Sequence, residues 1–447
     1  MLAILGFLTV ILLLAAVMSK KLSPTAALIS VPLVTGIIAS FFIKNDAGVV
    51  DFWSNIKALS GHITGSGGIG SVAATGVMFI FSILFFGVLK DAGTFRPIIS
   101  GILKVIGRDP VKITLGTAVL AMIVHLDGSG AVTFLICIPA LLPLYDAMKM
   151  RRTTLACTAA MAAGVMNIMP WGGPTIRAAS AMGVDVMVLF KPLILPVIIG
   201  LLAVLVLAFL LGRSEKKRLG AAGGASVSYE ETLTEEEESY LRPNRFVINI
   251  ILIIAAVAAL LFSGFAPAVV FMIAFVLAMV INYPNPELQG KLVNKHAPEA
   301  LMMASVLFAA GAFTGIMKGT GMIAAMAEAL VKVIPQSLGR FFPVITGVVS
   351  MPASLLFDPD SFYYGVLPVL SATAENFGVS GLSIARAAVL GQMTTGFPVS
   401  PLTAATFLLT GLAGVELGEH QKKTIPRAFL LTLVMLAAAL ILGAVEL

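Results

Sequence analysis

The sequence contains little charge for its length. Only 12% of its 447 residues are Asp, Glu, Lys or Arg, whereas about a quarter of a soluble domain is charged. Apolar residues make up 58%, and the mean hydropathy is +1.01. Apolar runs of about 20 residues, the length that a helix needs to cross the hydrocarbon layer, recur along the whole chain. This composition excludes a soluble globular protein and predicts an all-α, multi-pass membrane protein.

Cysteine is also scarce, with only Cys137 and Cys157, and both lie in apolar runs. This number and placement argue against a disulfide framework and against a cysteine zinc site. The net charge of +6 does not indicate nucleic acid as a partner, because excess Lys and Arg in a membrane protein mainly reflects topology. We therefore expect a lipid bilayer around the protein, no nucleic acid and no tightly bound cofactor.

Basic residues concentrate in alternate loops. The richer set lies near residues 20–21, 90–112, 149–152, 213–218, 242–245, 291–295 and 422–427. Loops rich in Lys and Arg stay in the cytoplasm. This pattern predicts a protein of the cell (inner) membrane whose termini both lie on the extracytoplasmic side.

A single polar stretch divides the chain into two halves. Residues 213–244 include an acidic run and a Gly-rich segment, which predict a cytoplasmic linker between residues 1–212 and 245–447. The halves resemble each other at a constant separation of 228, as from residue 87 to residue 315. The matches are GVLKDAG (Gly87 to Gly93) with GIMKGTG (Gly315 to Gly321), Pro170 with Pro398, Thr175 with Thr403, and Gly183 with Gly411.

The number of spanning segments decides how the two halves relate. We count five spanning segments per half, with one more that enters the membrane and returns. Because five is an odd number, the second half has the opposite orientation in the membrane to the first. The predicted fold is therefore two inverted five-helix repeats, the pattern of secondary transporters with a binding site near the middle of the membrane. A gene duplication without functional consequence is the alternative.

Each half contains an apolar run that a polar turn interrupts. In the first half, HLDGSGAVTF predicts a hairpin over about residues 112–146 that enters from the cytoplasm and turns at Asp127 to Gly130. In the second half, LLFDPDSFYYG predicts the tip of a hairpin over about residues 340–374 that enters from outside. Gly128 and Gly130 suit the first turn, because glycine adopts conformations that other residues avoid.

Each half also contains a helix that proline and glycine break. MNIMPWGGPTIRAASAMG breaks a helix over about residues 153–186, and TTGFPVSPLTAAT breaks one over about residues 381–412. Backbone groups cannot stay unpaired in lipid, so such breaks persist only around a protein cavity, where half-helix N-termini attract anions. We therefore predict a site between tips and breaks, with these substrate-binding candidates: Ser129, Gly130, Ala131, Asn167, Pro170, Gly172, Gly173, Thr175, Arg177, Ser361, Thr395, Gly396, Ser400 and Thr403.

Arg177 places a full positive charge just after the first break. A guanidinium binds a carboxylate through two parallel hydrogen bonds, so we predict that Arg177 binds an anionic substrate. The alternative is that Arg177 extends to the outer interface or pairs with an acid for structural reasons.

Asp127, Asp358 and Asp360 lie at the predicted hairpin tips, at membrane depth. Such a carboxylate can ligate a divalent metal of the Mg²⁺ or Ca²⁺ class, or carry a coupling proton. The alternative is a structural cap that accepts backbone amides at the turn. We interpret His125 as a buried histidine with satisfied hydrogen bonds rather than as a proton carrier.

Several of these segments resemble a known family. LDGSGAVTF, GVMNIMPWGGPTIRAASAMGVDV, FDPDSFYYGVLPVL and PVSPLTAATFLLTGLAGVELGEHQ are similar to the citrate–divalent-metal/proton symporters (CitMHS) of the ion-transporter superfamily, and the similarity covers nearly the whole chain. The resemblance implies a homodimer in which a transport domain slides like an elevator against a scaffold. It also implies that citrate crosses with a divalent metal and protons. The family often has LDGDG at the first tip, and Ser129 here removes one hard metal ligand.

The sequence thus predicts a symporter of citrate or a related di- or tricarboxylate, coupled to protons, and not an enzyme. Sodium coupling, metal-independent transport and another anion as substrate are alternatives, because Arg177 and the helix N-termini would serve any of them. A remote alternative is an intramembrane hydrolase with Ser129 as nucleophile and His125 as base. Two inverted copies would have no purpose in such an enzyme.

Overall fold

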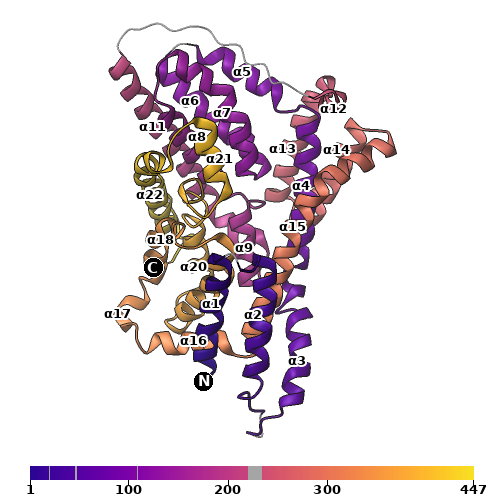
Figure 1. The fold of residues 1–447 in the computed structure, drawn as a ribbon, viewed down its shortest axis with the longest axis vertical. Coiled ribbons are helices and arrows are strands. Elements are labelled where there is room, and N and C mark those ends of the chain that lie inside the picture. Colours follow the sequence, from indigo (N-terminus) through magenta and orange to yellow (C-terminus); the bar gives the residue numbers. More distant parts are fainter. Residues whose placement is uncertain (20, 46–47, 108, 220–233, 447) are drawn as a thin grey trace.

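The computed structural model describes residues 1–19, 21–45, 48–107, 109–219 and 234–446, and the regular elements in these ranges are helical (Figure 1). Seven of the described helical segments are long and apolar enough to cross a membrane. The prediction of an all-α, multi-pass membrane protein is therefore confirmed. Lys20, Arg108 and residues 220–233 of the predicted linker lie outside the described residues.

The first half begins with α1 (Leu2–Met18), α2 (Pro24–Ala39) and α3 (Phe52–Thr64), and α3 leads directly into α4 (Ile69–Asp91). The helices that form the first hairpin and the first broken helix follow. They are α5 (Arg96–Ile106), α6 (Pro110–Val124), η1 (His125–Asp127), α7 (Gly130–Ala147), α8 (Arg152–Met166), α9 (Gly173–Met182), α10 (Val186–Phe190), η2 (Lys191–Leu193) and α11 (Ile194–Leu219).

The second half repeats this order of elements. After α12 (Glu235–Tyr240) and η3 (Pro243–Arg245), it has α13 (Phe246–Phe262), α14 (Pro267–Asn282), α15 (Pro286–Gly319), α16 (Met322–Val331), α17 (Gln336–Gly339) and α18 (Phe342–Ala353). It then has η4 (Ser361–Val366), α19 (Leu367–Asn376), α20 (Gly381–Val389), η5 (Phe397–Val399), α21 (Ala404–Ala413) and α22 (Leu417–Ile441). Both halves therefore contain two helices joined by a short polar turn, followed by two helices separated by an irregular segment.

Two details differ from the sequence prediction. The glycine with positive φ that ends α9 is Gly183, whereas the glycine that ends α21 is Gly414 and not Gly411. The second break is thus longer than the first, which an alignment without gaps does not detect. In addition, α11 continues to Leu219, so the predicted start of the linker at residue 213 lies inside a helix.

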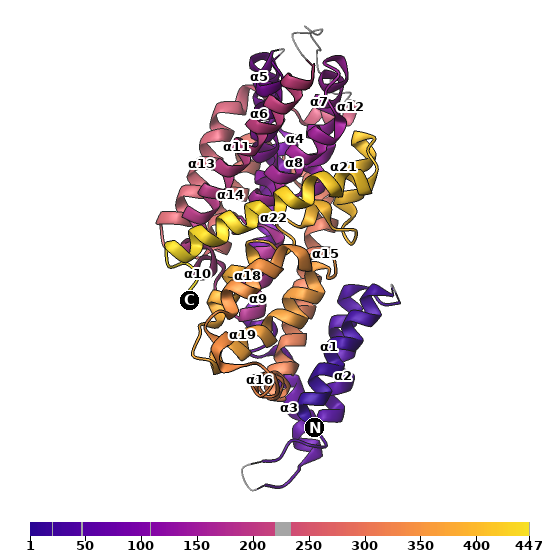
Figure 2. The ribbon, with the colours of Figure 1, turned by 90° about the vertical axis from the view of Figure 1, so that its left-hand side faces the viewer.

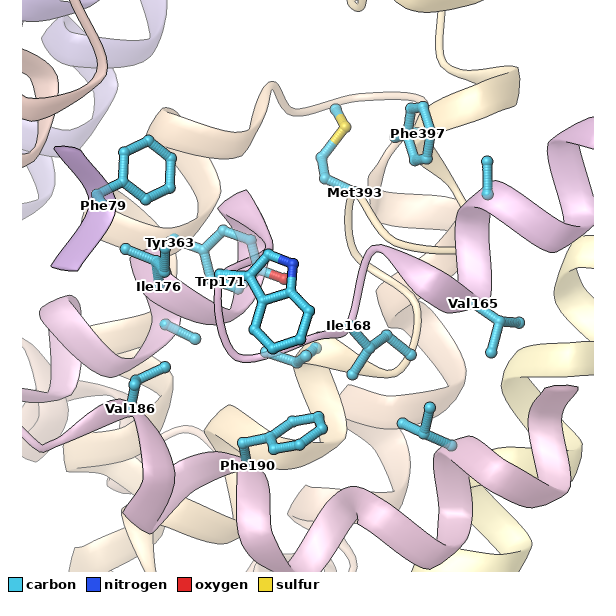
Figure 3. Close-up of a cluster of buried hydrophobic side chains, with 14 of the residues drawn as sticks. Phe79, Val165, Ile168, Trp171, Ile176, Val186, Phe190, Tyr363, Met393 and Phe397 are labelled. Atoms are coloured by element: carbon cyan, nitrogen blue, oxygen red, sulfur yellow. The ribbon is translucent and has the colours of Figure 1, made fainter. Parts of the chain in front are cut away.

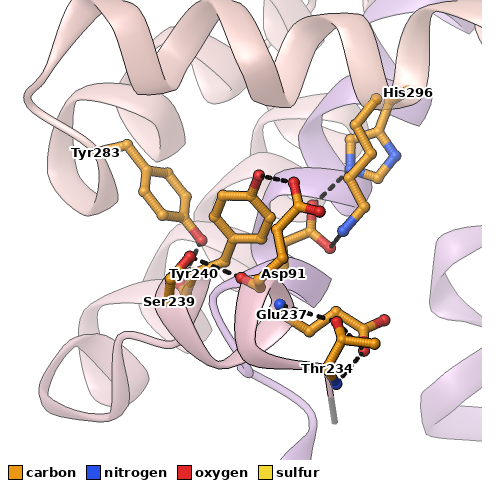
Figure 4. A network of polar contacts seen from close by, with 9 residues as sticks. Asp91, Thr234, Glu237, Ser239, Tyr240, Tyr283 and His296 are labelled. Carbon is orange, nitrogen blue, oxygen red and sulfur yellow. Dashed lines mark hydrogen bonds and ion pairs between the residues drawn. The ribbon is translucent and has the colours of Figure 1, made fainter.

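The end of the predicted linker is also structured. The hydroxyl of Tyr283 donates to the carbonyl of Tyr240 at the end of α12 (2.7 Å), and the N–H of Arg242 donates to Ala92 O (3.0 Å). Next to these contacts, Asp91 forms an ion pair with Lys295 and a contact with His296, both at 2.8 Å (Figure 4). Residues 235–242 are therefore held against the ends of α4 and α14 rather than free.

The helices pack as two groups. One contains α1 to α4 and α13 to α16, in which α15 contacts α2, α3 and α4, and α4 also contacts α14. The other contains α6 to α11 and α18 to α22, in which α11 contacts α6, α8 and α22, and α7 contacts α8 and α21. Figure 2 shows α1 and α2 beside α15, at a distance from the layer of α6, α8, α11 and α22. The two groups meet where α9 and η4 contact α15, and where α16 contacts α19.

Candidate functional site

The tip of the first hairpin consists of η1 and the start of α7. Gly128 turns the chain with a φ of +77°, which favours glycine. Asp127 Oδ1 accepts the backbone N–H of Ser129 (2.8 Å), and Ser129 Oγ accepts the N–H of Val132 (3.4 Å) at the start of α7. Asp127, Ser129 and Gly130 are partly buried, and Ala131 is exposed. Asp127 therefore caps the turn, and in the described part of the chain it forms no ion pair.

The tip of the second hairpin has a similar cap. Asp358 Oδ1 accepts the N–H groups of Asp360 (3.0 Å) and Ser361 (3.1 Å), and Asp358 Oδ2 accepts the hydroxyl of Ser361 (2.5 Å). The chain then enters the π-helix η4, a wide helical form that is frequent at functional sites. The capping interpretation thus describes one hydrogen bond of Asp127 and three of Asp358, and metal or proton binding by either residue stays a prediction.

The first break lies between α8 and α9. Thr175 Oγ1 donates to the carbonyl of Ile168 (2.8 Å) and so closes the gap from the α9 side. Pro170 and Gly172 are buried, and Gly173 is partly buried. The break is therefore inside the protein, as unpaired backbone in a membrane requires.

Trp171 fixes this break to both helix groups. Its Nε1 donates to Leu126 O in the first hairpin (2.8 Å), and its ring lies 5.7 Å from the ring of Phe86 and 5.8 Å from that of Phe271. Figure 3 shows Trp171 among buried apolar side chains that include Ile168 and Tyr363. The indole thus positions the first break against α4, α14 and the first hairpin.

The second break, between α20 and α21, is tied to the second hairpin through Ser354. Ser400 Oγ donates to Ser354 O (2.6 Å), and Ser354 Oγ accepts the N–H of Met393 (2.8 Å). Thr403 Oγ1 donates to Phe397 O (2.8 Å), which closes the gap as Thr175 does in the first half. Thr395 and Gly396 lie buried between these contacts.

Polar side chains join the two breaks and the first hairpin. Asn167 Nδ2 donates to Met393 O (2.8 Å), so an amide of the first break binds a carbonyl that the second break has freed. His125 contacts Asn167 Oδ1 through Nε2 (3.4 Å) and Thr133 Oγ1 through Nδ1 (2.8 Å). His125 is fully buried, and its two contacts confirm that it is a satisfied core histidine. We call the row Thr133, His125, Asn167 and Met393 the break bridge.

Small residues allow this close approach. A Cβ added at Gly164 would lie 2.9 Å from Thr395 Cα, and one at Gly130 would lie 2.7 Å from a ring atom of Phe397. Side chains at these two positions would separate α8 and the first tip from the second break. The hairpin tips and the breaks thus contact one another in one region.

Arg177 contacts the second hairpin. Its Nε lies 2.6 Å from Asp360 Oδ1, and the two side chains are 12% and 11% exposed. This ion pair joins α9 to the second tip. The alternative that Arg177 pairs with an acid therefore applies to its Nε atom. The two terminal nitrogens of the guanidinium form no hydrogen bond within the described residues.

Two hydroxyls near Arg177 also lack partners. Tyr364 Oη and Ser180 Oγ are buried and form no hydrogen bond within the described residues. Tyr364 and Arg177 line a very small cavity of about 10 Å³, and Phe79 and side chains of α15 form its other wall. Sequence reasoning missed Tyr364, although the unusual FDPDSFYYG segment that contains it marked the region.

A wider pocket reaches the second tip. It has about 940 Å³ of empty space between the α1–α2 loop and the hairpin, and Asp358, Asp360 and Leu402 line one side. The acidic tip is therefore accessible from a space large enough for a small organic anion. The described residues include no group of three His, Cys, Asp or Glu side chains that could hold a metal.

The geometry does not favour hydrolysis. Ser129 Oγ caps α7, and His125 is bonded to Thr133 and Asn167. Within the described residues, Ser129 and His125 share no hydrogen bond, so they do not form a nucleophile and base pair.

Polar hairpin tips that meet broken helices inside an apolar helical protein are typical of membrane transporters. Two solved structures share this fold: the YdaH transporter of Alcanivorax borkumensis (TM-score 0.61, 14% identity, 93% of this chain and 97% of that chain) and MtrF of Neisseria gonorrhoeae (TM-score 0.59, 12% identity, 94% of each). At these identities the similarity concerns the fold alone.

The chain belongs to the citrate transporter family, CitMHS, which matches residues 1–391. It is 42% identical to a "Citrate transporter" of Bacillus subtilis, over 100% of both chains. It is also 40% identical to a "Mg(2+)/citrate complex secondary transporter" of the same organism, over 100% of this chain and 99% of the relative. The family resemblance expected from the sequence is therefore confirmed, and the relatives are named as transporters and not as enzymes.

Proposed function

We propose that the protein is a secondary active transporter that carries citrate across the cell (inner) membrane as a complex with a divalent metal. The observation that carries the proposal is Arg177, whose terminal nitrogens form no hydrogen bond within the described residues and whose ion-pair partner, Asp360, lines the wide pocket at the second tip. The names of the full-length relatives support citrate and Mg²⁺ in particular. The remaining substrate-binding candidates lie in the same four segments, and their contacts with citrate are part of this proposal.

The metal is cargo in this proposal, held mainly by citrate. Mg²⁺ usually keeps water and uses only one or two protein carboxylates, and carboxylates of the substrate complete its shell. Asp358 is the best protein ligand, because it faces the wide pocket and no ion pair occupies it in the described part of the chain. Asp360 is engaged with Arg177 and becomes a second ligand only when the ion pair opens.

We assign proton coupling to Asp127, and sodium is the alternative coupling ion. Asp127 lies at the first tip, is partly buried and has one carboxylate oxygen without a hydrogen bond in the described residues. A carboxyl group in such a place can bind and release a proton as the hairpin moves.

For the movement, we propose an elevator mechanism in a homodimer of inverted repeats. The recurring order of elements supports two repeats, and α5 and α16 lie toward opposite ends of the molecule in Figure 1, which supports inversion. The group with α1 to α4 and α13 to α16 would serve as the scaffold. The group that holds the hairpins and breaks would move.

The decisive experiment is uptake of labelled citrate into proteoliposomes, with and without Mg²⁺ or Ca²⁺, under an imposed proton or sodium gradient. We expect accumulation that requires Mg²⁺ and a proton gradient directed inward. Equal uptake with a chelator present would refute the metal complex, and uptake driven only by sodium would refute proton coupling. Empty liposomes and a non-carboxylate anion are the controls.

The same assay tests Asp127. In Asp127→Asn, the proton gradient should no longer drive accumulation, whereas exchange of labelled for unlabelled citrate should continue, because the substrate contacts remain. Asp109→Asn is the matched control, since Asp109 also caps a helix of this hairpin but forms an ion pair with Lys216. Loss of exchange in Asp127→Asn would indicate a structural role instead.

Single cysteines test the inverted arrangement. A cysteine at the exposed Ala131 should react with an impermeant thiol reagent mainly from the cytoplasm, and one at the exposed Leu356 mainly from outside. The background is the chain with Cys137 and Cys157, both buried, replaced by serine. Citrate with Mg²⁺ should slow both reactions. Labelling of both positions from the same side would contradict inversion.

A further inference from the structure

A second polar pocket lies away from the hairpin tips. It has about 1310 Å³ of empty space between the start of α8, the end of α21 and the start of α22. Five basic residues line it: Arg151, Arg152, Lys422, Lys423 and Arg427. Among the described residues that line it, Glu419 is the one acid. We call it the basic pocket, and nothing in the proposed transport cycle uses it.

Three of these side chains are held in place by other protein groups. Arg152 forms two hydrogen bonds with Asp146 (2.8 and 2.7 Å), Lys423 donates to Thr154 (2.5 Å), and Arg427 donates to the carbonyl of Lys423. They therefore form a fixed basic wall.

Arg151 and Lys422 differ from the other three. Both are exposed, and their side chains form no ion pair or hydrogen bond within the described residues. The preference for basic residues in cytoplasmic loops explains why Arg151 and Lys422 are present. It does not explain why both line the same pocket.

The start of α8 strengthens this positive field. Arg151 is the N-cap residue of this 15-residue helix, and no side chain caps its first turn. The free N–H groups of that turn point beyond the helix end, where Thr153 and Arg151 line the pocket. Basic side chains together with unpaired backbone N–H groups at a helix N-terminus are typical of phosphate-binding sites.

Apolar side chains continue from the pocket along the same helices. Leu430 follows Arg427 by one turn of α22 and is 46% exposed, and Phe407 lies two turns before Gly414 on α21 and is 52% exposed. Residues spaced in this way share a helix face. A molecule with its anionic group in the pocket could therefore lay hydrocarbon on Leu430 and Phe407.

We infer that the basic pocket binds a phosphate group, and that this phosphate is the headgroup of an acidic phospholipid. Its two free cations, Arg151 and Lys422, contribute most of the selectivity for an acidic over a zwitterionic headgroup. Basic pockets between membrane helices are suited to this class of lipid.

The test uses the purified full-length protein in a mild detergent and the double variant Arg151→Gln/Lys422→Gln. Thermal stability is titrated with phosphatidylglycerol, with phosphatidylcholine of the same chains, and with inorganic phosphate. Phosphatidylglycerol should stabilise the wild type at the lowest concentration, and the double variant should need about 30-fold more. Lys104→Gln/Lys112→Gln, which removes two exposed charges outside the pocket, is the matched control and should behave like the wild type.

The outcomes separate the two sources of phosphate. In one outcome, inorganic phosphate stabilises the wild type as strongly as phosphatidylglycerol does and loses this effect equally in the double variant. That result would support a phosphate site but overturn the assignment to a lipid. Equal responses of wild type and double variant to every probe would overturn the site. The melting temperature without ligand should be unchanged in the double variant, because both side chains are exposed. If it falls, the single variant Lys422→Gln is used and should need several-fold more phosphatidylglycerol.

Discussion

Replacement of Arg177 by alanine should lower the affinity for citrate by about 10- to 150-fold, because a hydrogen bond to a charged group contributes about 1.5–3 kcal/mol. Arg177→Lys keeps the charge but cannot form the two parallel hydrogen bonds of a guanidinium. This variant should therefore retain transport at reduced affinity for citrate. Calorimetry on the purified variants measures both effects. The alanine variant should also melt at a lower temperature, since Asp360 would remain buried without its partner.

Asp360→Asn separates the two roles of Arg177. If the guanidinium serves only to hold the second hairpin, both substitutions break the same ion pair and should weaken citrate binding equally. If citrate competes with Asp360 for the guanidinium, Asp360→Asn frees Arg177 and should leave affinity unchanged or raise it in the absence of metal. Unaltered citrate affinity in Arg177→Ala would end the assignment of Arg177 to a substrate carboxylate.

Asn167→Ala should impair the site without touching either hairpin acid. It removes the hydrogen bond to Met393 O and the partner of His125 Nε2, both in the buried break bridge. A buried polar group left unpaired costs about 1–3 kcal/mol, so the two breaks should separate and citrate affinity should fall about 10- to 100-fold. A loss of thermal stability should accompany this decrease.

Asn376→Ala is the control for this experiment. Asn376 also donates its side-chain amide to a carbonyl, Ala372 O at 2.8 Å, but it is exposed at the end of α19. Water can replace that bond, so affinity and melting temperature should both stay close to those of the wild type. Normal citrate binding by Asn167→Ala would show that the break bridge does not support the site.

The positions of the turns and breaks could be predicted because the residues that cause them are local. Gly128 adopts a positive φ that other residues avoid, and Asp127 and Asp358 bind amides two or three residues ahead. Features that depend on insertions were predicted less well. The equivalence of Gly183 with Gly411 was wrong, because the longer second break moves the helix end to Gly414. The helical end of α11 was missed because charged residues such as Lys216 form a helix as readily as a linker.

The sequence by itself determined the class of protein and the family, and it predicted two hairpins and two broken helices, since hydropathy, glycine, proline and long motifs act over short stretches of chain. Only the tertiary structure decided which groups meet. Arg177 and Asp360 are separated by 183 residues and Asn167 and Met393 by 226, and no local pattern links the members of either pair. The close approach around Asn167 and Met393 depends on Gly164 and Gly130, at which a Cβ would collide with Thr395 and Phe397. Which donors then remain open, on Arg177 or in the basic pocket, depends on that packing.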